Sequence, residues 1–159
     1  MRIMGIDYGD RRIGVAISDP MAMIAGGIDT IVNTGDATKC ARDIAKVIAD
    51  YSVGKVVVGY PKNMNNSEGF RADATNKFIE SLKSCIDGVE IVKWDERLTT
   101  VQASRAMNDM GMKRKNKKGS IDKLSAVIIL QGYLDFLVNV KNDLRWILVQ
   151  IVKINVMII

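Results

Sequence analysis

The sequence predicts an α/β fold with a mixed five-stranded sheet, in which three antiparallel strands are followed by β-α-β units and helices cover both faces. Three short β-rich stretches follow one another closely at the start of the chain. Apolar residues at helical spacing then alternate with buried-strand runs. The chain has 159 residues, of which 48% are hydrophobic and 26% charged, as is typical of one soluble globular domain.

The first third of the chain is expected to form the antiparallel part of the sheet. Residues 2–8, 13–18 and 28–32 are rich in β-branched and other apolar side chains, and short turns containing glycine, aspartate or proline separate them. Connections this short join antiparallel neighbours.

The rest of the chain is expected to form the helices and two further strands. Ala41, Ile44, Ala45 and Ile48 recur at helical spacing, so a helix is predicted over residues 36–51. Strands are predicted over 55–60 and 89–94, and helices over 69–86, over 99–110 and from Ser120 onward. In a sheet of this order, functional side chains gather where the parallel strands end.

Histidine and cysteine usage excludes several kinds of chemistry. The chain has no histidine, so Ser-His-Asp and Cys-His catalytic groups and zinc sites that need histidine are excluded. Its two cysteines, Cys40 and Cys85, fall in predicted helices and do not indicate a disulfide scaffold. Because no signal peptide is visible either, we expect a cytoplasmic protein.

The positive charge lies in one short segment. The chain carries 23 basic and 18 acidic residues, a net charge of +5. Residues 113–118, called the basic run below, hold five of the basic residues: Lys113, Arg114, Lys115, Lys117 and Lys118. Without these five, the rest of the chain has no net charge. Such a run indicates a local anionic partner such as nucleic acid, or simply a solvated loop.

The C-terminal segment is unusually apolar. Of residues 144–159, 12 of 16 are hydrophobic, but the stretch is interrupted by Arg145 and Lys153 and is shorter than the roughly 20 residues that span a bilayer. We therefore expect no membrane partner and divide the chain into a domain over 1–138 and an extension over 139–159. The extension could be an edge strand, an oligomer contact or a reading-frame artefact, and the oligomeric state stays open.

Three acidic residues stand at positions that such a fold can bring together. Asp7 ends the first strand, Glu96 follows the fifth, and Asp122 lies in the first turn of the last helix. Oxygen ligands without histidine suit Mg²⁺ or Mn²⁺, which can activate water for attack on a phosphodiester. Each residue also has a purely structural interpretation: turn chemistry for Asp7, an ion pair with Arg97 for Glu96, and the helix dipole for Asp122.

Four ordered motifs resemble the YqgF family, also called RuvX, which has an RNase H-like fold. They are MGIDYGDRRIGVA (4–16), VGYPKNM with SEG (58–64 and 67–69), DERLTT (95–100) and IDKLSA with ILQGYL (121–126 and 129–134). The resemblance implies a metal-dependent nuclease with Asp7, Glu96 and Asp122 as catalytic residues and ligands of Mg²⁺ or Mn²⁺. It also implies that the substrate is the precursor of 16S ribosomal RNA, cleaved in 5′-end processing during ribosome biogenesis, with ribosomal particles as a possible partner. An alternative is a Holliday junction resolvase acting on branched DNA.

Further side chains in these motifs are candidates for contact with substrate phosphates. They are Arg11, Arg12, Lys62, Asn63 and Arg97, together with the basic run.

Two rival functions remain. The start of the chain also resembles the phosphate-binding start of actin-like ATPases and sugar kinases, although 159 residues cannot supply their two large domains. A non-catalytic RNA- or ribosome-binding module would use the basic run alone.

Overall fold

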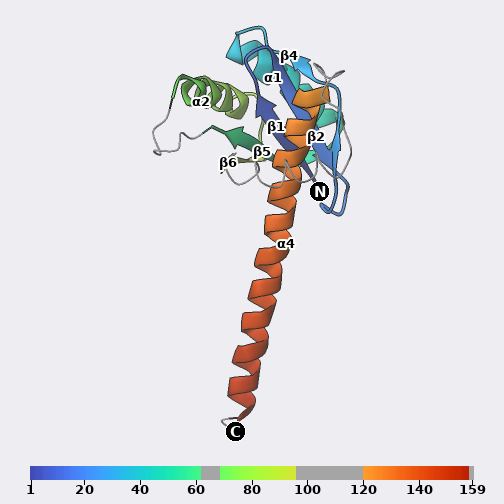
Figure 1. The fold of residues 1–159 in the computed structure, drawn as a ribbon, viewed down its shortest axis with the longest axis vertical. Coiled ribbons are helices and arrows are strands. Elements are labelled where there is room, and N and C mark those ends of the chain that lie inside the picture. Colours follow the sequence, from blue (N-terminus) through green and yellow to red (C-terminus); the bar gives the residue numbers. More distant parts are fainter. Residues whose placement is uncertain (62–68, 96–119, 158–159) are drawn as a thin grey trace.

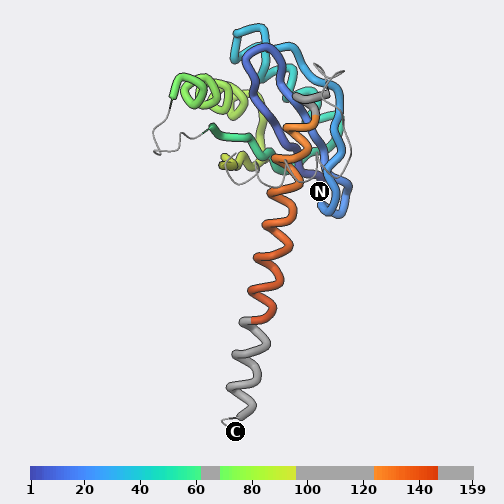
Figure 2. Tube along the Cα trace, viewed as in Figure 1, coloured from blue at the N-terminus to red at the C-terminus, as the bar shows by residue number. Residues whose placement is uncertain are grey.

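The computed structural model describes residues 1–61, 69–95 and 120–157, and for the last helix it describes the side chains of 124–146 (Figures 1 and 2). The strands are β1 (Arg2–Tyr8), β2 (Arg12–Ser18), β3 (Ala25–Gly27), β4 (Ile31–Val32), β5 (Val53–Tyr60) and β6 (Glu90–Asp95). The helices are α1 (Ala37–Asp50), α2 (Phe70–Lys83) and α4 (Ser120–Met157). The expected helix over 99–110 lies outside the described residues.

The strands form one mixed sheet in the order β3-β2-β1-β5-β6, with β4 also paired to β2. β1 pairs antiparallel with β2 and parallel with β5, and β5 pairs parallel with β6. Two hydrophobic clusters lie on its opposite faces, one under α1 and α2 and the other under α4 (Figure 1). The predicted mixed sheet with helices on both faces is therefore confirmed.

The third predicted strand, residues 28–32, is wrong in its bounds. Two shorter segments, β3 and β4, pair with β2 in its place, so the sheet has six strands. Gly27 lies opposite Ala16 and Ile31 opposite Ile13, so the three residues between the pairs on one side face two residues on the other. One extra residue in an antiparallel pair makes a β-bulge, which interrupts the ladder between the two segments.

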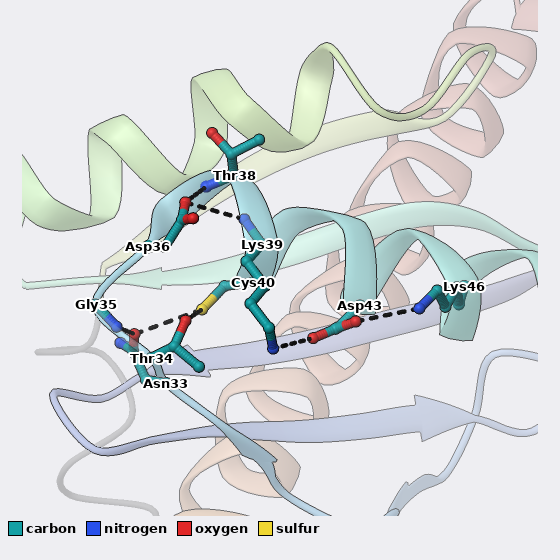
Figure 3. Close-up of polar contacts among 9 residues, drawn as sticks. All are labelled: Asn33, Thr34, Gly35, Asp36, Thr38, Lys39, Cys40, Asp43 and Lys46. Atoms are coloured by element: carbon teal, nitrogen blue, oxygen red, sulfur yellow. Dashed lines mark hydrogen bonds and ion pairs between the residues drawn. The ribbon is translucent and has the colours of Figure 1, made fainter.

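Helix α1 begins and ends as the sequence predicts. The carboxylate of Asp36 accepts hydrogen bonds from the backbone N–H groups of Thr38 (2.9 Å) and Lys39 (3.1 Å), which would otherwise lack partners at the helix start (Figure 3). Its inner face buries Cys40 and Ile44 against the sheet. α2 is shorter than the predicted 69–86: it ends at Lys83, and Cys85 and Ile86 pack against the core from the turn beyond.

Helix α4 lies directly on β1. A Cβ atom built on Gly5 would be 2.6 Å from Cβ of Leu130 and 2.9 Å from the carbonyl oxygen of Ala126, so a side chain at position 5 has no room. Ala126, Leu130 and Tyr133 are buried in this contact, with Ile129 and Leu134 beside them. The absence of a side chain on Gly5 therefore sets how closely the helix approaches the sheet.

Beyond the sheet, α4 continues as one straight helix to Met157 (Figure 1). An edge strand in residues 139–157, one of the alternatives for the extension, is therefore wrong. Within the described residues, Leu124–Trp146 is long and apolar enough to cross a membrane by length and composition, with a mean hydropathy of 1.4. The core helix of a soluble protein meets the same criterion, and the first half of this segment packs on the sheet.

Candidate active site

The carboxyl ends of β1, β5 and β6 meet at one edge of the sheet. The three strands are parallel and in register, with Ile6 opposite Val58 and Tyr60 opposite Asp95. Asp7 is the residue after Ile6, and β6 ends at Asp95. Asp7 and the end of β6 therefore lie at the same edge, separated by the single strand β5.

Asp7 lies on the face of the sheet that α4 covers. Along β1, Met4 and Ile6 belong to the cluster beneath α1 and α2, whereas Ile3 belongs to the cluster beneath α4 and Gly5 touches α4 directly. Because side chains alternate between the faces of a strand, Asp7 is on the same face as Gly5. Its side chain is partly buried.

α4 runs antiparallel to β1, so it begins at the edge where Asp7 lies. Gly5 contacts Ala126 and Leu130, while Lys55, which is paired with Ile3, lies 3.3 Å from the hydroxyl of Tyr133 through its Nζ. Later residues of the helix therefore lie at earlier residues of β1. Figure 1 shows the same direction, with the start of α4 at the end of the sheet where β1 finishes.

The turn after Asp7 is closed by backbone bonds. The N–H of Gly9 lies 3.1 Å from the carbonyl oxygens of both Asp7 and Arg12. A Cβ on Gly9 would be 2.7 Å from the Arg12 oxygen, so the turn requires glycine. The candidate phosphate-binding residues Arg11 and Arg12 are exposed here.

Two residues near this turn were missed by sequence reasoning. Tyr8 stacks on Phe78 of α2, with ring centroids 4.4 Å apart. Burial raises the pKa of Tyr8, Cys40 and Asp36 raise it further, and a hydrogen bond with Asn33 acts against them. Asn33 also donates from Nδ2 to the carbonyl oxygen of Gly9 at 2.8 Å. No motif indicates either contact, because each joins residues far apart in the sequence.

Other candidate residues lie outside the described part of the chain: Lys62, Asn63, Glu96, Arg97, Lys113, Arg114, Lys115, Lys117 and Lys118. Asp122 falls in the first turn of α4, and its side chain is also outside the described set. Among the residues whose side chains are described, no three Asp, Glu or Cys groups lie close enough to hold a metal ion. The convergence of Asp7, Glu96 and Asp122 thus stays a prediction.

Solved structures with this arrangement confirm the RNase H-like fold. One is "T. thermophilus RuvC in complex with Holliday junction substrate", with a TM-score of 0.54 and 13% identity over 86% of this chain and 96% of that chain. Another is the fowlpox virus Holliday junction resolvase, with a TM-score of 0.51 and 16% identity over 85% of this chain and 99% of that one. At these identities, the likeness concerns the fold alone.

Sequence comparison extends the likeness to named relatives. A protein of Ruminiclostridium cellulolyticum named "Putative pre-16S rRNA nuclease" is 52% identical over 135 residues, which are 85% of this chain and 94% of the relative. A protein of the same name from Acetivibrio thermocellus is 48% identical over 85% of this chain and 96% of the relative. The family model described as "RuvX: Holliday junction resolvase" matches residues 1–136. The chain therefore belongs to the RuvX family.

Proposed function

We propose that this chain is a metal-dependent nuclease that takes part in 5′-end processing of pre-16S rRNA, with Asp7, Glu96 and Asp122 as its metal ligands. Membership of the RuvX family makes it a nuclease, a hydrolase acting on phosphodiester bonds. The rRNA substrate is proposed because the relatives at 44–52% identity carry the name "Putative pre-16S rRNA nuclease".

The position of Asp7 is the observation that carries the proposal. Asp7 is a partly buried carboxylate at the end of β1, on the face of the sheet that α4 covers, and carboxylate oxygens are ligands of hard divalent cations. Asp122 precedes Ala126 by one helical turn, and Ala126 touches β1 two residues before Asp7. Glu96 directly follows β6, where Trp94, two residues earlier, packs in the cluster beneath α4. Chain positions thus favour the convergence of all three carboxylates.

The donor set fits a hard divalent cation. Carboxylate oxygens without histidine or thiolate are the ligands that Mg²⁺ and Mn²⁺ prefer. Such a cation supplies an activated water and neutralises charge on the phosphodiester. Asp7, Glu96 and Asp122 would hold it. Arg11 and Arg12, exposed on the adjacent turn, would bind substrate phosphates together with Lys62, Asn63 and Arg97. We place this activity in the cytoplasm, on free pre-rRNA or ribosomal particles.

The test is a cleavage assay with purified protein, Mg²⁺ or Mn²⁺, and two substrates: a pre-16S rRNA fragment with its 5′ extension, and a four-way DNA junction. Asp7→Asn keeps the size of the side chain but removes its charge, so we expect metal-dependent cleavage to fall to background. Asp10→Asn is the matched control, because Asp10 is an exposed carboxylate in the same turn whose ion pair is with Arg71, at 3.4 Å. It should retain wild-type turnover.

The outcomes of this assay distinguish the proposed function from its alternatives. Cleavage of the junction but not of the RNA would assign the chain to branched DNA, in agreement with the description of the family model. Unchanged turnover in Asp7→Asn would contradict the carboxylate mechanism. Binding without cleavage by the wild-type protein, under every metal condition, would favour a non-catalytic RNA- or ribosome-binding module.

The basic run is proposed to hold the nucleic-acid backbone. Replacing Lys115, Lys117 and Lys118 by Ala should weaken binding to all sequences alike, and should flatten the slope of log affinity against log salt by about two to three units, because each phosphate contact releases counterions. The control replaces three exposed lysines of α1 and α2, Lys39, Lys46 and Lys83, and should leave the slope closer to that of the wild type. Equal slopes in both triple variants would mean that residues 113–118 are only a solvated loop.

A further inference from the structure

We propose that Asn33 is a positioning residue for the acidic site, acting through the turn that follows Asp7. The inference rests on the proposed function of Asp7 as a metal ligand. Asn33 lies between β4 and the N-terminal cap of α1, and its side chain reaches the turn between β1 and β2. It therefore connects the strand that carries Asp7 to a helix on the opposite face of the sheet.

Asn33 is held at this junction by four hydrogen bonds, in addition to its hydrogen bond with Tyr8. Its Nδ2 donates to the carbonyl oxygen of Gly9 at 2.8 Å, and its backbone N–H donates to the carbonyl oxygen of Arg11 at 3.0 Å. Its Oδ1 accepts from the backbone N–H of Gly35 at 2.9 Å and from Sγ of Cys40 at 3.5 Å. Figure 3 shows the Oδ1 contacts beside the start of α1.

The bond to Gly9 lies two residues from the proposed metal ligand. The N–H of Gly9 donates to the carbonyl oxygen of Asp7 at 3.1 Å, and the carbonyl oxygen of Gly9 accepts from Asn33. The same glycine is therefore hydrogen-bonded to both residues. Moving the Gly9 carbonyl would move the end of β1 and the adjacent arginines. A shift of about 1 Å in a reacting group can cost about a hundredfold in rate, so a modest displacement is measurable.

The side-chain amide of Asn33 donates a hydrogen bond through Nδ2 and accepts hydrogen bonds through Oδ1. A substitution can therefore remove the donor and keep the acceptor. Asn33→Asp keeps an oxygen to accept from Gly35 and Cys40 but replaces the donor to Gly9 by a second oxygen. Asn33→Ala removes both halves without adding charge. Cys40→Ala is the matched control, because it removes a hydrogen bond to the same amide from the α1 side and leaves the bond to Gly9 intact.

The experiment compares the full-length wild-type chain with these three variants, at a temperature well below every melting midpoint. Metal-dependent cleavage gives kcat and KM, titration with Mn²⁺ alone gives the binding constant for the metal, and ¹H–¹⁵N spectra report the amides of Asp7, Gly9 and Arg11. We expect kcat to fall at least about tenfold in both Asn33 variants. We also expect weaker Mn²⁺ binding and displaced Gly9 and Arg11 signals. Cys40→Ala should change kcat by less than twofold.

A merely structural role would give a different result. The two Asn33 variants would then melt earlier, while kcat and Mn²⁺ binding of the folded protein matched the wild type, and this result would overturn the inference. A fall in kcat in Asn33→Asp alone would also overturn it, because the added charge would then be the cause. Asp7→Asn, assayed in parallel, separates the two proposals. If that variant cleaves normally, the proposed function fails; if it is inactive while both Asn33 variants are normal, only the role of Asn33 fails.

Discussion

Gly5 shows how one missing side chain shapes the candidate site. α4 approaches β1 so closely that a Cβ on Gly5 would lie 2.6 Å from Cβ of Leu130. The nearby carbonyl oxygen belongs to Ala126, one helical turn after Asp122. The distance between the start of α4 and the end of β1 therefore depends on this contact.

We predict that Gly5→Ala destabilises the protein by about 1–3 kcal/mol, because the helix must shift to make room in a well-packed core. Urea unfolding followed by circular dichroism measures this change. Gly26→Ala is the control: a Cβ there would meet only the carbonyl oxygen of Ile17, at 3.7 Å, which is an ordinary contact. A Gly5→Ala variant as stable as the wild type would mean that α4 does not pack closely against β1 at this point.

At the scale of elements, Asp19 organises the connection from β2 to β3. Its carboxylate accepts from the backbone N–H groups of Met23 (2.6 Å), Ile24 (2.8 Å) and Met21 (3.2 Å). The hydrogen bond from Ile24, followed by those from Met23 and Met21, lowers the pKa of Asp19 below its usual value of 3.8. The charged form is therefore the one that the folded loop prefers.

This preference predicts a pH dependence of stability. Because the folded pKa is depressed, the contribution of Asp19 is present well above pH 3.8 and is lost as the pH falls through the folded pKa. Between pH 6 and pH 3, the urea midpoint of the wild type should fall further than that of Asp19→Asn. Asp87→Asn, at an exposed position in the turn before β6, serves as control. Parallel profiles for the wild type and Asp19→Asn would contradict the role of the loop bonds.

Local sequence pattern predicted most elements but not the contacts between them. The apolar period of α1 and the Val56-Val57-Val58 run of β5 are strong local signals, and both elements appear where they were expected. The β-bulge that divides the third strand into β3 and β4 depends on pairing with β2, which no local pattern shows. The bond from Asn33 to Gly9 spans 24 residues and is likewise a product of the tertiary fold. Asp7 was found because a charged residue ending an apolar strand is conspicuous in sequence.

At the scale of the whole molecule, the described side chains of α4 pass from buried to exposed along the helix. Leu134 is almost fully buried under the sheet, and Leu137 is the last of the described side chains of the helix (124–146) that packs against this cluster. Beyond it, the described side chains are exposed, with Leu144 at 56% and Trp146 at 65% of full exposure. The family match ends at residue 136, close to the same point. We therefore propose residues 1–138 as the nuclease domain and 139–159 as an extension.

Removing the extension tests this division. A chain ending at residue 138 keeps every described side chain of the two hydrophobic clusters, so we expect cooperative unfolding with a Tm within a few degrees of the full-length value and unchanged metal-dependent cleavage. Leu134→Ala in the full-length chain is the contrasting variant. It removes a side chain that is 1% exposed and should cost about 2–5 kcal/mol, because a cavity remains beneath the helix. If the shortened chain fails to fold while Leu134→Ala is tolerated, the exposed half of α4, and not its contact with the sheet, stabilises the molecule.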